Sequence, residues 1–197
     1  MTITYQVSNG LYINMTNQCS NSCEFCVRER QDAVGDADSL WLEREPSREE
    51  IWDDIQKRGD LSRYSEIVFC GFGEPTERLD DMLWLCEKLK AAGAPPIRVN
   101  TNGHASLIAG RDVTPEFDGL VDALSVSLNS HCDDEYMRLC RPAFGLGAYG
   151  AMLDFAVKAR AYVPKVVLSV VLGTTDTEAC RKVAEKAGLP LRVRREI

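Results

Sequence analysis

Short apolar runs alternate with helix-like stretches along most of this 197-residue chain, and this alternation constrains the fold more than any other feature. The runs are rich in Val, Ile and Leu, as buried strands are. Strands that alternate with helices form βαβ units, whose right-handed crossovers produce a parallel sheet. The expected strands lie at residues 11–15, 66–70, 97–101, 122–128, 165–172 and 190–194.

Helical periodicity fills the intervals between these runs. Ser47 is followed three residues later by Glu50, which is the pattern of a capping box, and Gly59 ends that helix. Apolar residues at three- and four-residue spacing predict further helices near residues 79–90, 152–159 and 178–186. Six strands fall short of a closed eight-stranded barrel, so we expect an α/β fold with an open or partial barrel, or a doubly wound sheet.

Composition and charge restrict the class of protein and the cellular compartment that we expect for this fold. The chain is 45% hydrophobic and 27% charged, it has no apolar run of membrane-spanning length, and its net charge of −7 disfavours a phosphate-binding surface over the whole molecule. The N-terminus lacks the basic-then-apolar pattern of a signal peptide, and no repeat or linker marks a boundary. We therefore expect a single minimal domain over residues 1–197 in the reducing cytoplasm, without a membrane partner.

Three of the eight cysteines share one short segment after the first expected strand. Cys19, Cys23 and Cys26 form a CxxxCxxC pattern, and thiolates select zinc or iron–sulfur clusters. A structural zinc site ordinarily adds a fourth cysteine or histidine, but His104 and His131 are isolated, and we expect both to be solvated loop residues. The pattern favours a 4Fe–4S cluster with one open iron. The alternative is a non-catalytic module, either zinc-stabilised or an electron carrier.

The remaining cysteines lack this spacing. A lone cysteine on an apolar strand or helix face usually acts as a small hydrophobe. We therefore expect packing or incidental thiols at Cys70, Cys86, Cys132, Cys140 and Cys180.

The three-cysteine segment also carries an aromatic residue, Phe25, just before its third cysteine. This pattern, on the loop after the first strand of a βα chain, resembles the signature of radical S-adenosylmethionine (SAM) enzymes. The resemblance implies a partial (β/α)6 barrel and a cluster whose open iron binds the amino and carboxylate groups of SAM. Reductive cleavage of SAM would then give a 5′-deoxyadenosyl radical that abstracts hydrogen from a substrate.

A second segment supports the same resemblance. Gly71, Phe72, Gly73, Glu74 and Pro75 are similar to the family's Gly-Gly-Glu-Pro turn, although Phe72 stands where a small residue is common. Such a turn offers backbone carbonyls and the Glu74 carboxylate to the ammonium group of SAM.

The ends of later strands complete the SAM site that the resemblance implies. Ser127 and Asn129 are expected to hold the ribose, and a residue near Val171 is expected to touch the adenine. Asn100 and Asn102 fit either this site or an ordinary turn.

Longer strings extend the resemblance over nearly the whole chain. LYINMTNQCSNSCEFCVR, LWLEREPS, EIVFCGFGEPTERLD, RVNTNG and SVSLN are similar to the small radical SAM proteins named for their association with the TatD family. That name records a genomic association and supplies no reaction. The resemblance implies a reductant protein of flavodoxin or ferredoxin type, and the substrate is left open between a small molecule and a macromolecule.

Two groups of arginines lie near expected strand ends. For both we expect an exposed or edge-protecting role, with binding of an anionic substrate as the alternative. The groups are Arg28, Arg138 and Arg141, and Arg192, Arg194 and Arg195 at the end of the chain.

Overall fold

The computed structural model describes residues 1–195 of the chain. Seven strands form one sheet in sequence order, and every neighbouring pair is parallel except the first. The strands are β1 (Thr4–Val7), β2 (Gly10–Ile13), β3 (Glu66–Phe69), β4 (Ile97–Thr101), β5 (Ala123–Ser127), β6 (Lys165–Val171) and β7 (Leu191–Arg194). All six expected strands are present, and the predicted α/β fold with a partial barrel is confirmed.

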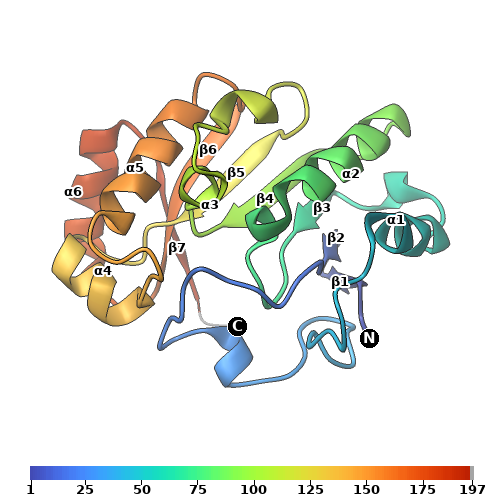
Figure 1. Ribbon diagram of the computed structural model, residues 1–197, viewed down its shortest axis with the longest axis horizontal. Helices are drawn as coiled ribbons and strands as arrows, with labels where there is room; N and C mark the ends of the chain where they lie inside the picture. The colour runs from blue at the N-terminus through green and yellow to red at the C-terminus, as the bar shows by residue number, and fades with distance from the viewer. Residues whose placement is uncertain (196–197) are drawn as a thin grey trace.

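Helices cover one face of this sheet (Figure 1). Four match the expected segments: α1 (Arg48–Lys57), α2 (Leu79–Ala91), α5 (Ala148–Ala159) and α6 (Thr177–Ala187). The sequence patterns did not indicate the two shorter helices, α3 (Ala105–Ala109) and α4 (Asp133–Cys140). Short 3-10 turns complete the connections at η1 (Val27–Glu29), η2 (Leu61–Arg63), η3 (Pro75–Arg78) and η4 (Thr114–Phe117).

The antiparallel strand β1 is the seventh strand, which the sequence analysis missed. It turns back into β2 through a tight hairpin in which Ser8 has a φ of 52°. The two loop residues are Ser8 and Asn9, because Val7 pairs with Gly10. Serine and asparagine are common in turns, so the sequence carried a turn signal at this point. The rings of Tyr5 and Tyr12 then pack across the pair with centroids 5.3 Å apart.

The helix-covered face of the sheet is apolar. Leu11, Ile67, Val99, Leu124 and Leu168 occupy this face on successive strands, and all are fully buried. Burying a side chain of this size stabilises a fold by about 1.5–3 kcal/mol. The main hydrophobic core therefore lies between the sheet and its helices.

The opposite, concave face carries polar side chains at alternate positions. Asn100 pairs in register with Ser125, Ser127 with Ser169, and Ser169 with Arg192. No α-helix covers this face in Figure 1; instead, the long segment between β2 and α1, which includes η1, runs across it. This arrangement encloses space beside the carboxyl ends of the parallel strands, where ligands of α/β folds bind.

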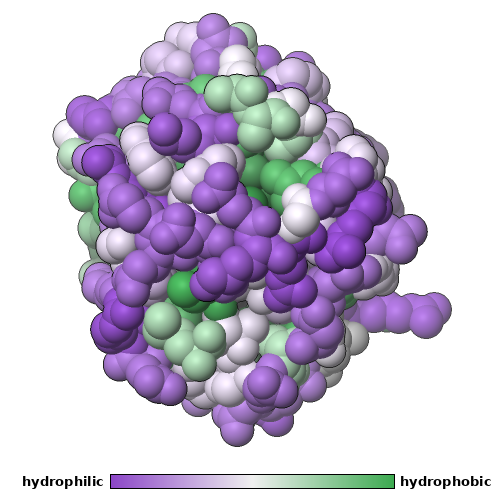
Figure 2. Space-filling model, turned by 90° about the vertical axis from the view of Figure 1, so that its right-hand side faces the viewer, coloured by the Kyte–Doolittle hydropathy of each residue, from purple (hydrophilic) through white to green (hydrophobic). Residues whose placement is uncertain are grey.

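The outer surface on the side of α1 is mostly hydrophilic, with only small separate hydrophobic patches (Figure 2). Within residues 1–195, no helix is both long and apolar enough to cross a membrane.

Candidate functional site

A cavity of about 300 Å³ lies between the concave face and the segment that crosses it. This volume is at the lower end of the range of small-molecule sites. Every residue that the sequence analysis placed in a cofactor site lines this cavity except Pro75, which is buried at the start of η3. The lining residues among them are Cys19, Cys23, Phe25, Cys26, Gly71, Phe72, Gly73, Glu74, Asn100, Asn102, Ser127, Asn129 and Val171.

The three clustered cysteines are partly buried and free. Burial raises the pKa of Cys19 to about 12 and also raises the pKa of Cys26. The pKa of Cys23 is raised chiefly by a hydrogen bond with Cys140, a core residue that was expected only to pack. These thiols are therefore protonated at neutral pH, and a positively charged metal group must displace their protons on binding.

The chemistry of this donor set fits an iron–sulfur cluster. Within residues 1–195, no three His, Cys, Asp or Glu side chains converge as ligands of a single metal ion. A zinc ion needs its ligands to meet at one point, whereas each thiolate of a 4Fe–4S cluster binds a different iron. Cys19, Cys23 and Cys26 supply three thiols from one loop, and all three line the cavity.

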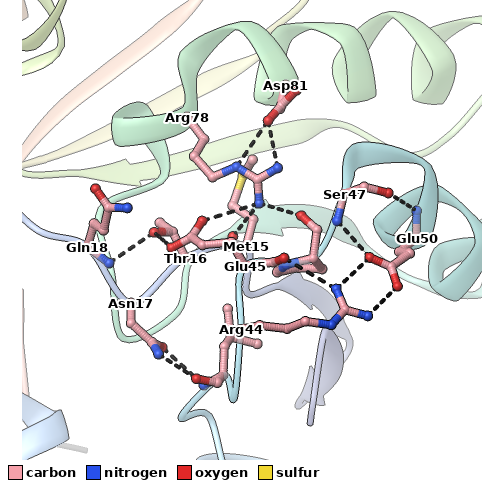
Figure 3. Close-up of polar contacts among 12 residues, drawn as sticks. Met15, Thr16, Asn17, Gln18, Arg44, Glu45, Ser47, Glu50, Arg78 and Asp81 are labelled. Carbon is pink, nitrogen blue, oxygen red and sulfur yellow. Dashed lines mark hydrogen bonds and ion pairs between the residues drawn. The ribbon is translucent and has the colours of Figure 1, made fainter.

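Arg78 clamps the base of the cysteine-bearing segment. Its guanidinium donates to the carbonyl oxygens of Met15 at 2.8 Å and Pro46 at 2.7 Å, and it pairs with Asp81 at 2.6 Å (Figure 3). One side chain of η3 thus joins both ends of the long segment to the start of α2. This clamp fixes where the segment enters and leaves the concave face.

A buried polar network holds the part of the segment between the first two cysteines. His104 Nδ1 lies 3.3 Å from Ser20 Oγ, and His104 Nε2 lies 3.2 Å from the Tyr136 hydroxyl. Asn21 donates to the same hydroxyl at 3.1 Å. The expectation that His104 is a solvated loop residue is wrong: it is fully buried, and burial lowers its pKa to about 4. A neutral imidazole is therefore the form that anchors the segment.

Asn102 combines the two roles left open for it in the sequence. Its Oδ1 accepts the backbone N–H of His104 at 2.9 Å, which shapes the turn after β4. Its Nδ2 donates to Ser20 Oγ at 2.8 Å and lies 3.9 Å from the sulfur of Cys19. The turn therefore also positions the first cysteine.

The glycines after β3 allow the two loops to pack backbone to backbone. A Cβ atom on Gly73 would clash with the carbonyl oxygens of Thr16 and Gln18, and one on Gly71 would clash with Asn14. The N–H of the next residue, Glu74, donates to the Gln18 carbonyl at 2.7 Å. No larger residue fits at either glycine unless the cysteine segment moves.

The Glu74 carboxylate lies inside this packed region and is 3% exposed. Its Oε1 accepts bonds from the Thr76 N–H and hydroxyl and from the Thr101 hydroxyl, at 2.8–3.1 Å. Among residues 1–195, its Oε2 accepts only the Asn102 N–H, at 2.6 Å. Burial raises the pKa of Glu74, and the hydrogen bonds oppose that rise. Oε2 retains acceptor capacity for a ligand ammonium group.

Phe72, the departure from the usual turn, belongs to a second small core. It packs with Tyr5 and Leu40, and the ring of Trp41 meets it edge-on with centroids 5.1 Å apart. The larger side chain therefore attaches the crossing segment to the turn and closes that wall of the cavity.

Asn129 leaves a buried polar atom without a partner at the cavity wall. Its backbone has a φ of 55°, and its Oδ1 is fully buried with no hydrogen bond from any residue of 1–195. An unsatisfied buried acceptor costs about 1–3 kcal/mol, so a ligand hydroxyl at this position would be stabilised. This geometry fits the ribose contact expected for Asn129.

The concave face also brings arginines into the cavity. Arg192, Arg194 and Arg195, for which edge protection was the main expectation, line it together with Arg30 and Arg98. For Arg98, Arg192 and Arg194 the signal was the two-residue alternation of polar side chains on β4 and β7, which places them on one face. In contrast, Arg138 and Arg141 are 62% and 58% exposed and pair with Glu24, as expected of surface charges. Arg28 pairs with Glu29 and is outside the lining.

Comparisons with known proteins agree with this geometry. A family model described as the radical SAM superfamily matches residues 13–187. Over 79 residues, or 40% of the chain, it is 35% identical to a 5-amino-6-(D-ribitylamino)uracil–L-tyrosine 4-hydroxyphenyl transferase of Nostoc sp.. Over 170 residues, or 86% of the chain, it is 26% identical to molybdenum cofactor biosynthesis protein 1 of Dictyostelium discoideum. It spans only 18% and 25% of these two relatives.

A solved structure shares the fold. The structure of native anSMEcpe with bound AdoMet superposes with a TM-score of 0.60 at 14% identity, over 94% of this chain and 50% of that one. The family match begins at the last residue of β2, ends with α6, and includes the cysteine segment, the glycine turn and strands β3 to β6. The chain belongs to the radical SAM superfamily.

Proposed function

We propose that this chain is a radical SAM enzyme whose cluster is held by Cys19, Cys23 and Cys26. When bound, a 4Fe–4S cluster supplies the electron that cleaves SAM to a 5′-deoxyadenosyl radical, which then abstracts hydrogen from the substrate. The proposal rests on one observation: the three thiols, the glycine turn and the unpartnered Asn129 oxygen all line the same cavity.

The chain's own residues position SAM and exclude water. Gly71 and Gly73 let the SAM amino group approach the backbone of the turn, and Glu74 accepts a hydrogen bond from it. Because the chemistry belongs to the cofactors, the protein contributes orientation and a closed site. Phe25 and Phe72 form apolar parts of the cavity wall, which limit access of water.

The later strands hold the nucleoside. Ser127 and Asn129 bind the ribose hydroxyls, Val171 contacts the adenine, and Asn100 contributes a further polar group from β4. All four line the same cavity.

The finer assignments rest on sequence patterns. We propose that residues 1–197 form one radical SAM domain, related to the small TatD-associated proteins by the five strings quoted above. Cytoplasmic location and reduction by a flavodoxin- or ferredoxin-type protein complete the proposal, because free thiols and a low-potential cluster need a reducing setting.

The experiment is anaerobic reconstitution with iron and sulfide, followed by an assay for 5′-deoxyadenosine formed from SAM under a strong reductant. We expect product from the wild type and from Cys132→Ala, the matched control outside the cavity lining, and none from Cys23→Ala. A colourless protein with about one zinc per chain would favour a structural site. A cluster that never binds SAM would favour an electron carrier.

A further inference from the structure

Three arginines lie on the concave face of the sheet. Arg98 comes from β4, and Arg192 and Arg194 come from the edge strand β7, where they stand two residues apart on the same face. All three line the cavity that the cysteines also line. We call Arg98, Arg192 and Arg194 the arginine cluster.

One carboxylate balances part of this charge. Glu66 accepts hydrogen bonds from Arg98 at 2.9 Å and 2.7 Å, and its pKa is lowered by Arg98 and, more weakly, by Arg192. Within residues 1–195, neither Arg192 nor Arg194 forms an ion pair with a carboxylate. The arginine cluster therefore has three positive groups and one negative group in a chain whose net charge is −7.

Arg194 shows the imbalance most clearly. Its Nε is fully buried and makes no hydrogen bond with any residue of the described chain. Burial lowers the pKa of Arg194, and the nearby charges of Arg192 and Arg98 lower it as well. A buried donor without a partner, next to like charges, is an unfavourable arrangement unless an anion joins it.

A carboxylate or phosphate group supplies what is missing. The planar guanidinium fork matches both groups, and one such anion can accept from two arginines at once. We propose that the substrate carries a carboxylate or phosphate that binds Arg192 and Arg194, an inference that rests on the proposed function. The anion then holds the substrate against β7, in the same cavity as the cysteine segment, where SAM cleavage takes place.

SAM also has a carboxylate, so the test must separate two sources of the same chemistry. The probes are inorganic phosphate and malonate, titrated by calorimetry into the anaerobic, reconstituted protein with and without saturating SAM. We expect at least one probe to bind while SAM is present. Arg194→Gln and Arg192→Gln should each weaken that binding by roughly 10- to 100-fold, as expected when a hydrogen bond to a charged group is lost. Arg181→Gln, on the exposed side of α6, is the matched control.

Binding of SAM and formation of 5′-deoxyadenosine without substrate should be unchanged in both glutamine variants. Arg192 is exposed, so its variant remains informative if Arg194→Gln does not fold. The inference is overturned if neither probe binds the wild type or if both variants bind the probes as the wild type does. It is also overturned if the two substitutions weaken SAM binding as much as they weaken probe binding. If probe binding depends on the arginines but the wild type forms no 5′-deoxyadenosine, the anion site stands and the proposed function fails.

Discussion

The two faces of the sheet are built from the same strands but differ in their chemistry. Toward the helices, Leu124 and its neighbours on adjoining strands are apolar and fully buried. Toward the cavity, the next residue on the same strand, Ser125, pairs with Asn100. On the same face of that strand, Ser127 begins a polar row that continues through Ser169 to Arg192. Burial of the apolar face stabilises the fold, whereas the polar face supplies the groups that can bind ligands. Substitutions on the first face should therefore change the free energy of unfolding, and substitutions on the second should change binding.

The largest expected effect is on the apolar face. Leu124→Ala should lower the free energy of unfolding by about 2–5 kcal/mol, because it leaves a cavity in a close-packed core. Chemical denaturation of the wild type and the variant measures this difference. A loss below about 1 kcal/mol would mean that the helices do not pack on this face as described.

The next effect concerns the buried network that holds the cysteine segment over the polar face. The pKa of His104 is lowered by burial from 6.5 to about 4. As pH falls from 7 to 4, His104 takes up a proton in the unfolded chain but largely not in the native state. The free energy of unfolding therefore falls by about 3 kcal/mol over this range. Denaturation across this range should show the loss in the wild type and a flatter profile in His104→Gln. Parallel profiles would contradict the neutral, buried assignment.

A pair of glycines tests the close approach of the two loops. Gly73→Ala should destabilise the protein by about 1–3 kcal/mol and reduce cluster retention, because its Cβ clashes with the backbone of the cysteine segment. Gly150→Ala is the matched control: it lies in α5 with open space around its Cβ, and should stabilise by about 0.5–1 kcal/mol. Thermal melting and iron content are the measurements. Equal effects of the two substitutions would refute the packing argument.

The smallest effect on stability is expected on the polar face. Ser127→Ala should change the free energy of unfolding by no more than about 0.5 kcal/mol, because its side chain is only half-buried. In the proposed site it should weaken SAM binding by about 0.5–1.5 kcal/mol, the contribution of one hydrogen bond. Calorimetry with SAM and denaturation together separate the two quantities. A stability loss like that of Leu124→Ala would erase the contrast between the faces.

The sequence was most informative where a local pattern repeats. Alternating strand and helix patterns predicted β2 to β7 and four helices, and Ser47 and Glu50 form the predicted capping box. The turn residues Ser8 and Asn9 lie between two short runs of four residues, so the β1–β2 hairpin gives a weaker signal than the longer βαβ units. The short helices α3 and α4 give less periodic signal than the longer ones, because five and eight residues make few turns.

Burial of single polar residues was harder to predict. His104 follows a glycine in a turn, which is typical of an exposed loop, but α4, the cysteine segment and the ring of Phe144 pack around it. The arginines of β7 likewise resemble the charges of an edge strand. β7 is an edge strand, but the curvature of the sheet directs its arginines into the cavity, and no local pattern reports that curvature.

The most direct test of the central claim is the response of the reconstituted cluster to SAM. Iron, sulfide and electron paramagnetic resonance are measured on the reduced wild type before and after SAM is added. The account predicts about four irons and four sulfides per chain, a requirement for all three of Cys19, Cys23 and Cys26, and a spectrum that changes when SAM binds the open iron. A cluster that survives Cys23→Ala, or a spectrum that SAM leaves unchanged, would contradict it.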